Sequence, residues 1–230
     1  MPILIVGGTR GTGLLIARRL SSQRPVRVLA RDPARARERL GPEIGILPGD
    51  LTHPETLPAA VRQAEHVVFT AGCRSGYPAR EARIRATEYQ GVLHTLNALK
   101  DGGFSGRFLY MNASGGTVPS FASWALNLYK GNTLQWRHRA EEAIRSSGID
   151  YTIIRAGFLL NSRGGARAIR ITQEALPLTL RYRIARADVA EVFLAALDHP
   201  NTSRATFEAV WGNGPRQQRW EDQLRLLRPD

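Results

Sequence analysis

The sequence has few of the groups that crosslink a chain or hold it in a membrane. Its one cysteine, Cys73, cannot form an internal disulfide or a cysteine-rich metal cluster, which is typical of a reducing compartment. No stretch reaches the roughly eighteen apolar residues that a membrane span needs, and the first residues do not resemble a secretory signal. We therefore expect a cytoplasmic protein with no membrane partner and no metal site.

Acidic residues are also scarce: 20 stand against 32 basic residues, which gives a net charge of +12, and all but two of the basic residues are arginine. Such an excess can mark a nucleic-acid-binding protein. Here the arginines are dispersed along the chain, and no basic run reaches about five residues. The pattern favours an anionic small molecule over nucleic acid as the partner.

Short β-branched runs alternate with longer helical patterns along the 230 residues. This alternation predicts an α/β fold, a doubly wound and mostly parallel Rossmann sheet with helices on both faces. The predicted strands are 3–6, 26–30, 44–48, 66–70, 107–111, 151–155 and 206–210, and the predicted helices are 12–21, 54–63, 79–100, 134–147 and 186–198. We expect one domain over 1–230, with 158–185 as a substrate-side insert and 215–230 as a C-terminal amphipathic helix.

A glycine-rich turn, Gly7-Gly8-Thr9-Arg10-Gly11-Thr12-Gly13, follows the first predicted strand and leads into a helix. Glycine lets the backbone approach a pyrophosphate closely, and the helix N-terminus presents unpaired N–H groups and a partial positive charge. Between a buried strand and a helix, this turn predicts dinucleotide binding. The expected contacts come from Gly7, Thr9, Arg10, Gly11, Thr12 and Gly13, and a tight turn without a ligand is the alternative.

The end of the second predicted strand indicates which dinucleotide binds. A NAD-selective protein carries an acidic residue there for the ribose 2′-hydroxyl, whereas this chain has Arg31 followed by Asp32. The Arg31 guanidinium could hold a 2′-phosphate through two parallel hydrogen bonds, and Arg10 could add a second positive charge. The sequence therefore predicts NADP(H) as the cofactor. In the alternative, Arg31 is a solvated surface residue and Asp32 binds the ribose.

Further motifs follow the remaining strands in a fixed order. They are Gly49-Asp50-Leu51, Thr70-Ala71-Gly72, Asn112-Ala113-Ser114, Gly157 after the sixth strand, and Ala187-Asp188-Val189-Ala190. Together with the glycine turn, this set resembles the atypical short-chain dehydrogenase/reductases of the NAD(P)H-binding, NmrA-like and biliverdin-reductase-B-like branch. The resemblance covers nearly the whole chain.

The resemblance implies roles for these motifs. Asp50 and Leu51 would meet the adenine, although Asp50 could instead form a turn or cap a helix. Thr70, Ala71 and Gly72 would line the central channel, and Gly157 with Phe158 would border the nicotinamide. Asn112 would hold a carbonyl or a water molecule.

Standard members of this family use Ser, Tyr and Lys for catalysis. The resemblance places Ser114 at the serine, Thr133 at the tyrosine and Arg137 at the lysine. Arg137 can still hydrogen-bond a ribose, but a threonine hydroxyl is too weak an acid to replace a phenol. Tyr129 would share a face with Thr133 and Arg137 on a continuous helix, so we expect Ser114, Tyr129 and Arg137 as catalytic candidates. Packing of Tyr129 at the helix entrance is the alternative.

These residues predict an NADP(H)-dependent oxidoreductase that transfers hydride to a small acceptor. Because the dihydronicotinamide supplies the hydride, a planar conjugated or carbonyl-containing acceptor needs mainly to be positioned beside it. Aromatic residues near the expected crevice suit a flat acceptor or belong to the core; they are Phe121, Trp124, Trp136, Phe158 and Tyr182. The alternative is a catalytically inactive NADP(H)-binding redox sensor of the NmrA-like type. We expect a monomer or a homodimer.

Overall fold

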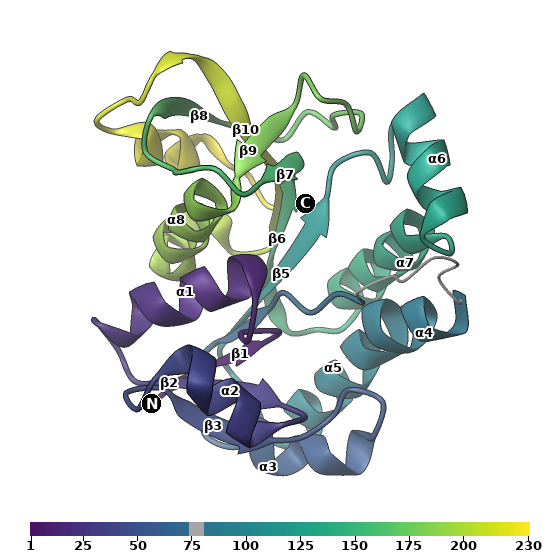
Figure 1. The fold of residues 1–230 in the computed structure, drawn as a ribbon, viewed down its shortest axis with the longest axis vertical. Coiled ribbons are helices and arrows are strands. Elements are labelled where there is room, and N and C mark those ends of the chain that lie inside the picture. The colour runs from purple at the N-terminus through teal and green to yellow at the C-terminus, as the bar shows by residue number, and fades with distance from the viewer. Residues whose placement is uncertain (74–80) are drawn as a thin grey trace.

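Short apolar runs form the strands of one central sheet in the computed structural model, which describes residues 1–73 and 81–230. The strands, in chain order, are β1 (Ile3–Val6), β2 (Val26–Ala30), β3 (Gly45–Pro48), β4 (Val67–Phe69), β5 (Arg107–Ala113), β6 (Asp150–Ala156), β8 (Arg167–Thr172) and β10 (Ala205–Pro215). They lie side by side in the order β3-β2-β1-β4-β5-β6-β10-β8 (Figure 1). Every neighbouring pair is parallel except β10 and β8.

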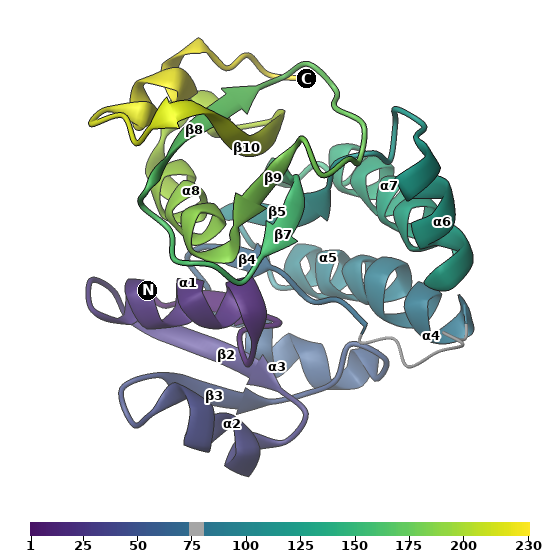
Figure 2. The ribbon, with the colours of Figure 1, turned by 45° about the horizontal axis from the view of Figure 1, so that its top comes forward.

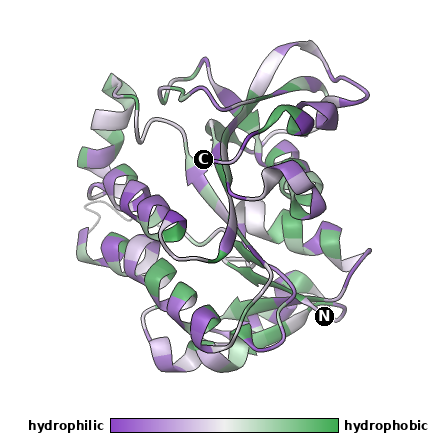
Figure 3. Ribbon diagram, turned by 180° about the vertical axis from the view of Figure 1, so that it is seen from behind, coloured by the Kyte–Doolittle hydropathy of each residue, from purple (hydrophilic) through white to green (hydrophobic). Residues whose placement is uncertain are grey.

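Helices cover both faces of this sheet (Figure 2). The helices are α1 (Gly11–Ser21), α2 (Pro33–Leu40), α3 (Leu57–Val61), α4 (Glu81–Arg85), α5 (Gly91–Asp101), α6 (Phe121–Tyr129), α7 (Thr133–Arg145) and α8 (Arg186–Asp198). Side chains alternate across β1, so Ile3 and Ile5 join one core with α1 and α8, whereas Leu4 and Val6 join another with α3, α5 and α7. The covering helices carry hydrophobic and hydrophilic residues in turn (Figure 3). The predicted doubly wound α/β fold is confirmed.

The strand order changes direction between β1 and β4, because the chain builds outward from β1 toward β3 and then from β4 toward β6. The loops that leave the carboxyl ends of these two strands therefore turn to opposite faces and open a crevice between them. Open α/β sheets bind ligands at this position. The glycine turn after β1 and the segment after β4 both lie there.

The structure has two helices that the periodicity did not predict. Asp32 caps α2, because its carboxylate accepts a hydrogen bond from the Arg35 backbone N–H (3.0 Å) and Pro33 occupies the first turn. Ser120 and Ser123 form a reciprocal capping box at the start of α6. The predicted helix 79–100 begins outside the described residues, and within them it contains a π-helical segment, Ala86–Gln90, between α4 and α5.

The C-terminal third contains strands that were not predicted and lacks the expected C-terminal α-helix. Two short strands, β7 (Phe158–Leu160) and β9 (Arg183–Ala185), form a separate parallel pair, while β8 extends the main sheet as an antiparallel edge strand. In place of an α-helix over 215–230, β10 runs to Pro215 and a 3₁₀ helix covers Trp220–Leu226. Trp220, Leu224 and Leu227 are buried in the core beside α8. No helix among the described residues is long and apolar enough to cross a membrane.

Candidate functional site

The carboxyl ends of the central strands open into a groove of about 1070 Å³. It is walled by the glycine turn, the segments that follow β2, β3 and β4, the last residues of β5, and one face of α7. Most of the predicted cofactor-binding residues line it, namely Gly7, Thr9, Arg10, Gly11, Thr12, Gly13, Arg31, Asp50, Leu51, Thr70, Ala71, Gly72, Asn112 and Arg137. The groove lining does not include Gly157, Phe158, Ser114 or Tyr129.

The glycine turn packs too closely against the end of β4 to accept side chains. A Cβ on Gly7, whose φ is +90°, would lie 2.6 Å from the Ala71 backbone nitrogen. A Cβ on Gly13 would lie 2.4 Å from both the Gly7 carbonyl oxygen and Thr70 Oγ1. Since no side chain caps the first turn of α1, its N–H groups remain available to an anion in the groove. This cradle fits the pyrophosphate of a dinucleotide.

Arginines gather in the groove where β2 ends. Arg31, Arg35 and Arg39 line this part, whereas the Arg10 guanidinium of the glycine turn donates to the Gly72 carbonyl oxygen after β4 (2.7 Å). Among the described residues, Arg31 and Arg35 form no ion pair. The Asp32 carboxylate, the alternative ribose ligand, is engaged in capping α2. This end of the groove is therefore strongly positive and suits an anionic group.

The turn after β3 holds the two residues that the resemblance assigns to adenine. Asp50 Oδ1 accepts hydrogen bonds from the backbone N–H and the hydroxyl of Thr52, both at 2.9 Å. Asp50 thus forms the turn that was its alternative role, and it also lines the groove. Leu51 is buried beside it and contributes an apolar surface to the groove.

A buried carboxylate organises the other end of the groove. Glu88, 1% exposed, lies in the π-helical segment and accepts hydrogen bonds from Arg137 Nε (2.8 Å), Lys130 Nζ (3.0 Å) and the Thr133 hydroxyl. It also accepts one from the Cys73 backbone N–H (2.9 Å). Burial acts to raise the pKa of Glu88, but Arg137 and Lys130 lower it to about 2. We call Glu88, Lys130, Thr133 and Arg137 the Glu88 cluster.

Three members of the Glu88 cluster line the groove: Lys130, Thr133 and Arg137. Arg137 is fixed further by a hydrogen bond from Nη1 to the Met111 carbonyl oxygen (3.1 Å). Burial and the positive charge of Arg137 lower the pKa of Lys130, against the opposing effect of Glu88. The periodicity did not single out Glu88, because one glutamate in a helical stretch carries no signal that it is buried and paired with residues more than forty positions away.

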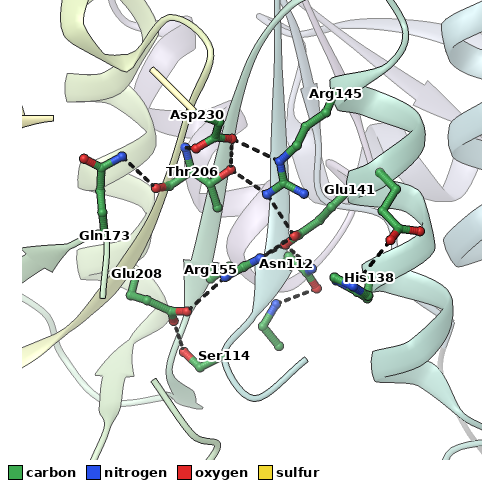
Figure 4. A network of polar contacts seen from close by, with 12 residues as sticks. Asn112, Ser114, His138, Glu141, Arg145, Arg155, Gln173, Thr206, Glu208 and Asp230 are labelled. Atoms are coloured by element: carbon green, nitrogen blue, oxygen red, sulfur yellow. Dashed lines mark hydrogen bonds and ion pairs between the residues drawn. The ribbon is translucent and has the colours of Figure 1, made fainter. Parts of the chain in front are cut away.

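A second polar network joins side chains of β5, β6, β10 and α7 (Figure 4). The buried Glu141 carboxylate accepts hydrogen bonds from Asn112 Nδ2 (2.6 Å) and from Arg155 Nε (2.8 Å) and Nη2 (2.5 Å). The Ser114 hydroxyl donates to Glu208 Oε2 (2.5 Å). Burial raises the pKa of Glu208 to about 7. Asn112 joins this network to the groove, because it belongs to both.

The structure does not bring Ser114, the expected catalytic serine, to the groove. Ser114 is fully buried, and its hydroxyl is directed to Glu208. The backbone N–H of Ser114 donates to the carbonyl oxygen of Ala156, the last residue of β6 (3.0 Å). Its neighbour Asn112 reaches the groove instead.

The expected continuous helix through Tyr129 and Arg137 is wrong. Helix α6 ends at Tyr129, and α7 begins at Thr133 after Gly131 (φ +51°) and Asn132 (φ +56°) take left-handed conformations. Tyr129 is half exposed and does not line the groove, whereas Lys130 does. The aromatic residues expected near the crevice do not line it either; Phe121 is 82% and Trp124 is 61% exposed on α6.

Arg186 is one of several cationic residues of the groove that were not among the predicted site residues; the others are Arg35, Arg39, Arg83 and Lys130. Arg186, the first residue of α8, reaches the glycine turn, where its Nη1 lies 3.5 Å from Thr12 Oγ1. The only available signal was its place just before the Ala187-Asp188-Val189-Ala190 motif.

The comparisons with known proteins agree with this geometry. A family model described as NAD(P)H-binding matches residues 7–200. The chain belongs to the NAD(P)H-binding family. The resemblance to atypical short-chain dehydrogenase/reductases drawn from the motifs is thereby confirmed.

Relatives in this family include enzymes named as reductases. The chain is similar to sanguinarine reductase from Eschscholzia californica, with 27% identity covering 90% of this chain and 88% of the relative. It is also similar to an NAD(P)H azoreductase from Xenophilus azovorans, with 30% identity covering 86% of this chain and 64% of the relative.

Solved structures share the fold at lower identity. An oxidoreductase from Lactococcus lactis superposes with a TM-score of 0.79 at 17% identity, covering 99% of this chain and 96% of that one. An anaerobilin reductase from Escherichia coli O157:H7 has a TM-score of 0.72 at 22% identity, with 93% and 98% coverage. A short-chain dehydrogenase/reductase from Veillonella parvula, in complex with NADP, has a TM-score of 0.72 at 17% identity, with 93% and 95% coverage.

Proposed function

We propose that the protein is an NADP(H)-dependent oxidoreductase that reduces a small planar or carbonyl-containing acceptor by direct hydride transfer. The observation that carries this proposal is the groove, in which a phosphate cradle, a positive adenosine end and the Glu88 cluster follow one another. Its relatives named as a sanguinarine reductase and an azoreductase support a reductase.

The choice of NADP(H) over NAD(H) rests on charge. A 2′-phosphate adds an anionic group to the adenosine ribose, and Arg31 and Arg35 line the groove near the end of β2. A guanidinium holds a phosphate through parallel charge-assisted hydrogen bonds. Asp32, which would favour a ribose 2′-hydroxyl, already accepts the Arg35 backbone N–H as the cap of α2.

The nicotinamide supplies the hydride when the cofactor is bound. The residues of this chain then position the two reactants. Arg137 and Asn112 would hydrogen-bond the ribose and the acceptor, because both line the groove. Glu88 holds Arg137 in place, and Glu141 holds Asn112. No tyrosine among the described residues lines the groove, so we infer that the proton comes from water or from Lys130 Nζ.

The test mixes the protein with NADPH and a panel of quinones, flavins, azo compounds and aldehydes, and follows the absorbance of the nicotinamide. We expect at least one acceptor to be reduced, faster with NADPH than with NADH at equal concentration. Arg137→Met, which removes the positioning guanidinium, should slow the reaction. Tight NADPH binding without any turnover would favour the redox-sensor alternative, and absence of binding would refute both.

A further inference from the structure

Arg186, which belongs to the C-terminal half of the chain, lies beside the glycine turn. Its Nη1 is 3.7 Å from the position that a Cβ on Gly11 would take and 3.5 Å from Thr12 Oγ1, and its Nε donates to Asn161 Oδ1 (2.9 Å). Arg186 and Asn161 both line the groove. The guanidinium is thus held at the first turn of α1.

The backbone that carries Arg186 is fixed to α1. Arg19 of α1 donates from Nη1 to the Ala187 carbonyl oxygen (2.8 Å) and forms an ion pair with Glu191 (3.2 Å). Both α1 and α8 pack in the same core through Ile16 and Val189. The position of the Arg186 guanidinium relative to the glycine turn is therefore set by two packed helices.

Arg186 has only neutral hydrogen-bond partners among the described residues, Asn161 and Thr12. The nearest acid in sequence, Asp188, instead accepts hydrogen bonds from Arg216 Nη1 (3.1 Å) and Trp211 Nε1 (2.6 Å). Burial lowers the pKa of Arg186, with no neighbouring anion to oppose it. A partly buried cation that lacks a counter-ion is costly, and an anion in the groove would compensate it.

We propose that Arg186 is a cofactor-binding residue, and that its guanidinium binds the pyrophosphate oxygens at the first turn of α1, beside Gly11 and Thr12. This inference rests on the proposed function. The Arg186 guanidinium lies at contact distance from Gly11 and Thr12, at the uncapped first turn of α1, so a pyrophosphate bound at that turn lies next to it. The C-terminal half of the chain thereby contributes to the cofactor site.

The role predicts a dependence on which part of the cofactor is present. In this proposal Arg31 binds the 2′-phosphate and Arg186 binds the pyrophosphate. Adenosine 2′-monophosphate has no 5′-phosphate, so its affinity should not depend on Arg186. We expect Arg186→Gln to weaken NADP⁺ binding about 10- to 100-fold in calorimetry. The same variant should bind adenosine 2′-monophosphate within about twofold of the unsubstituted protein. Arg186→Lys, which keeps the charge, should recover part of the loss.

The control is Arg183→Gln, which removes one positive charge three residues away from an exposed side chain outside the groove. It should leave both affinities unchanged, which separates a local contact from the general field of a basic protein. Circular dichroism confirms that each variant is folded. Unchanged NADP⁺ affinity in Arg186→Gln, or an equal loss for adenosine 2′-monophosphate, would overturn the inference. If the unsubstituted protein binds no dinucleotide, the proposed function fails instead.

Discussion

Replacing Glu88 by glutamine should destabilise the folded protein at neutral pH, because the substitution leaves Arg137 and Lys130 without their buried counter-charge. A tenfold change in proton affinity corresponds to about 1.4 kcal/mol, so lowering a carboxyl pKa from 4.5 to about 2 stabilises the fold by about 3 kcal/mol. For a chain of 230 residues this corresponds to a decrease in Tm of roughly 6–12 °C.

The assay is denaturant unfolding at pH 7 and at a series of lower pH values. The stabilisation by Glu88 is fully present above the unfolded pKa of 4.5, and it is lost as the pH falls toward about 2. The difference between Glu88→Gln and the unsubstituted protein should shrink over that range. Glu142→Gln is the control, because Glu142 is 63% exposed and pairs only with His138 among the described residues. A loss below about 1 kcal/mol at pH 7 in Glu88→Gln would refute the reasoning.

Three further predictions address the groove and the second polar network. Arg31→Gln should weaken NADP⁺ binding about tenfold or more and leave NAD⁺ binding unchanged in calorimetry; equal effects on both would remove Arg31 from cofactor selection. Tyr129→Phe should leave the rate of NADPH oxidation within about twofold in the nicotinamide absorbance assay, since Tyr129 lies outside the groove, and a large loss would restore it as proton donor. Burial raises the pKa of Glu208 from 4.5 to about 7, so stability should fall by about 3 kcal/mol as the pH rises between these values. Glu208→Gln should flatten that slope in pH-dependent unfolding, and an unaltered slope would contradict the assignment.

Local signals in the sequence were sufficient for the parallel strands of the sheet and the phosphate cradle, but not for the antiparallel edge strand β8. Strands such as β1 are apolar on both faces. The glycine turn was recognisable because it has glycine at positions where a Cβ would clash with neighbouring atoms. Helix α2 also had local signals, Asp32 as cap and Pro33 in the first turn, but its eight residues carry little apolar periodicity. Gly131 and Asn132 mark the break between α6 and α7. The comparison of Tyr129 with Arg137 assumed a continuous helix and did not use this signal.

The chemistry of the site depended on pairings that no local pattern encodes. Glu88 meets Arg137 and Lys130 only because α7 packs against the π-helical segment, and Ser114 meets Glu208 only because β10 joins the sheet beside β6. Arg186 reaches the glycine turn because α8 packs on α1. These contacts follow from tertiary packing, so spacing along the chain predicted the groove but also placed in it Ser114 and Tyr129, which do not line it.

Isothermal titration calorimetry with NADP⁺ and NAD⁺ tests most directly whether the groove binds a dinucleotide. The account predicts one NADP⁺ per chain, bound at least about tenfold more tightly than NAD⁺, with an affinity that falls as salt rises because guanidinium–phosphate contacts are screened. Absence of binding heat for both dinucleotides, with no thermal stabilisation by either, would contradict it.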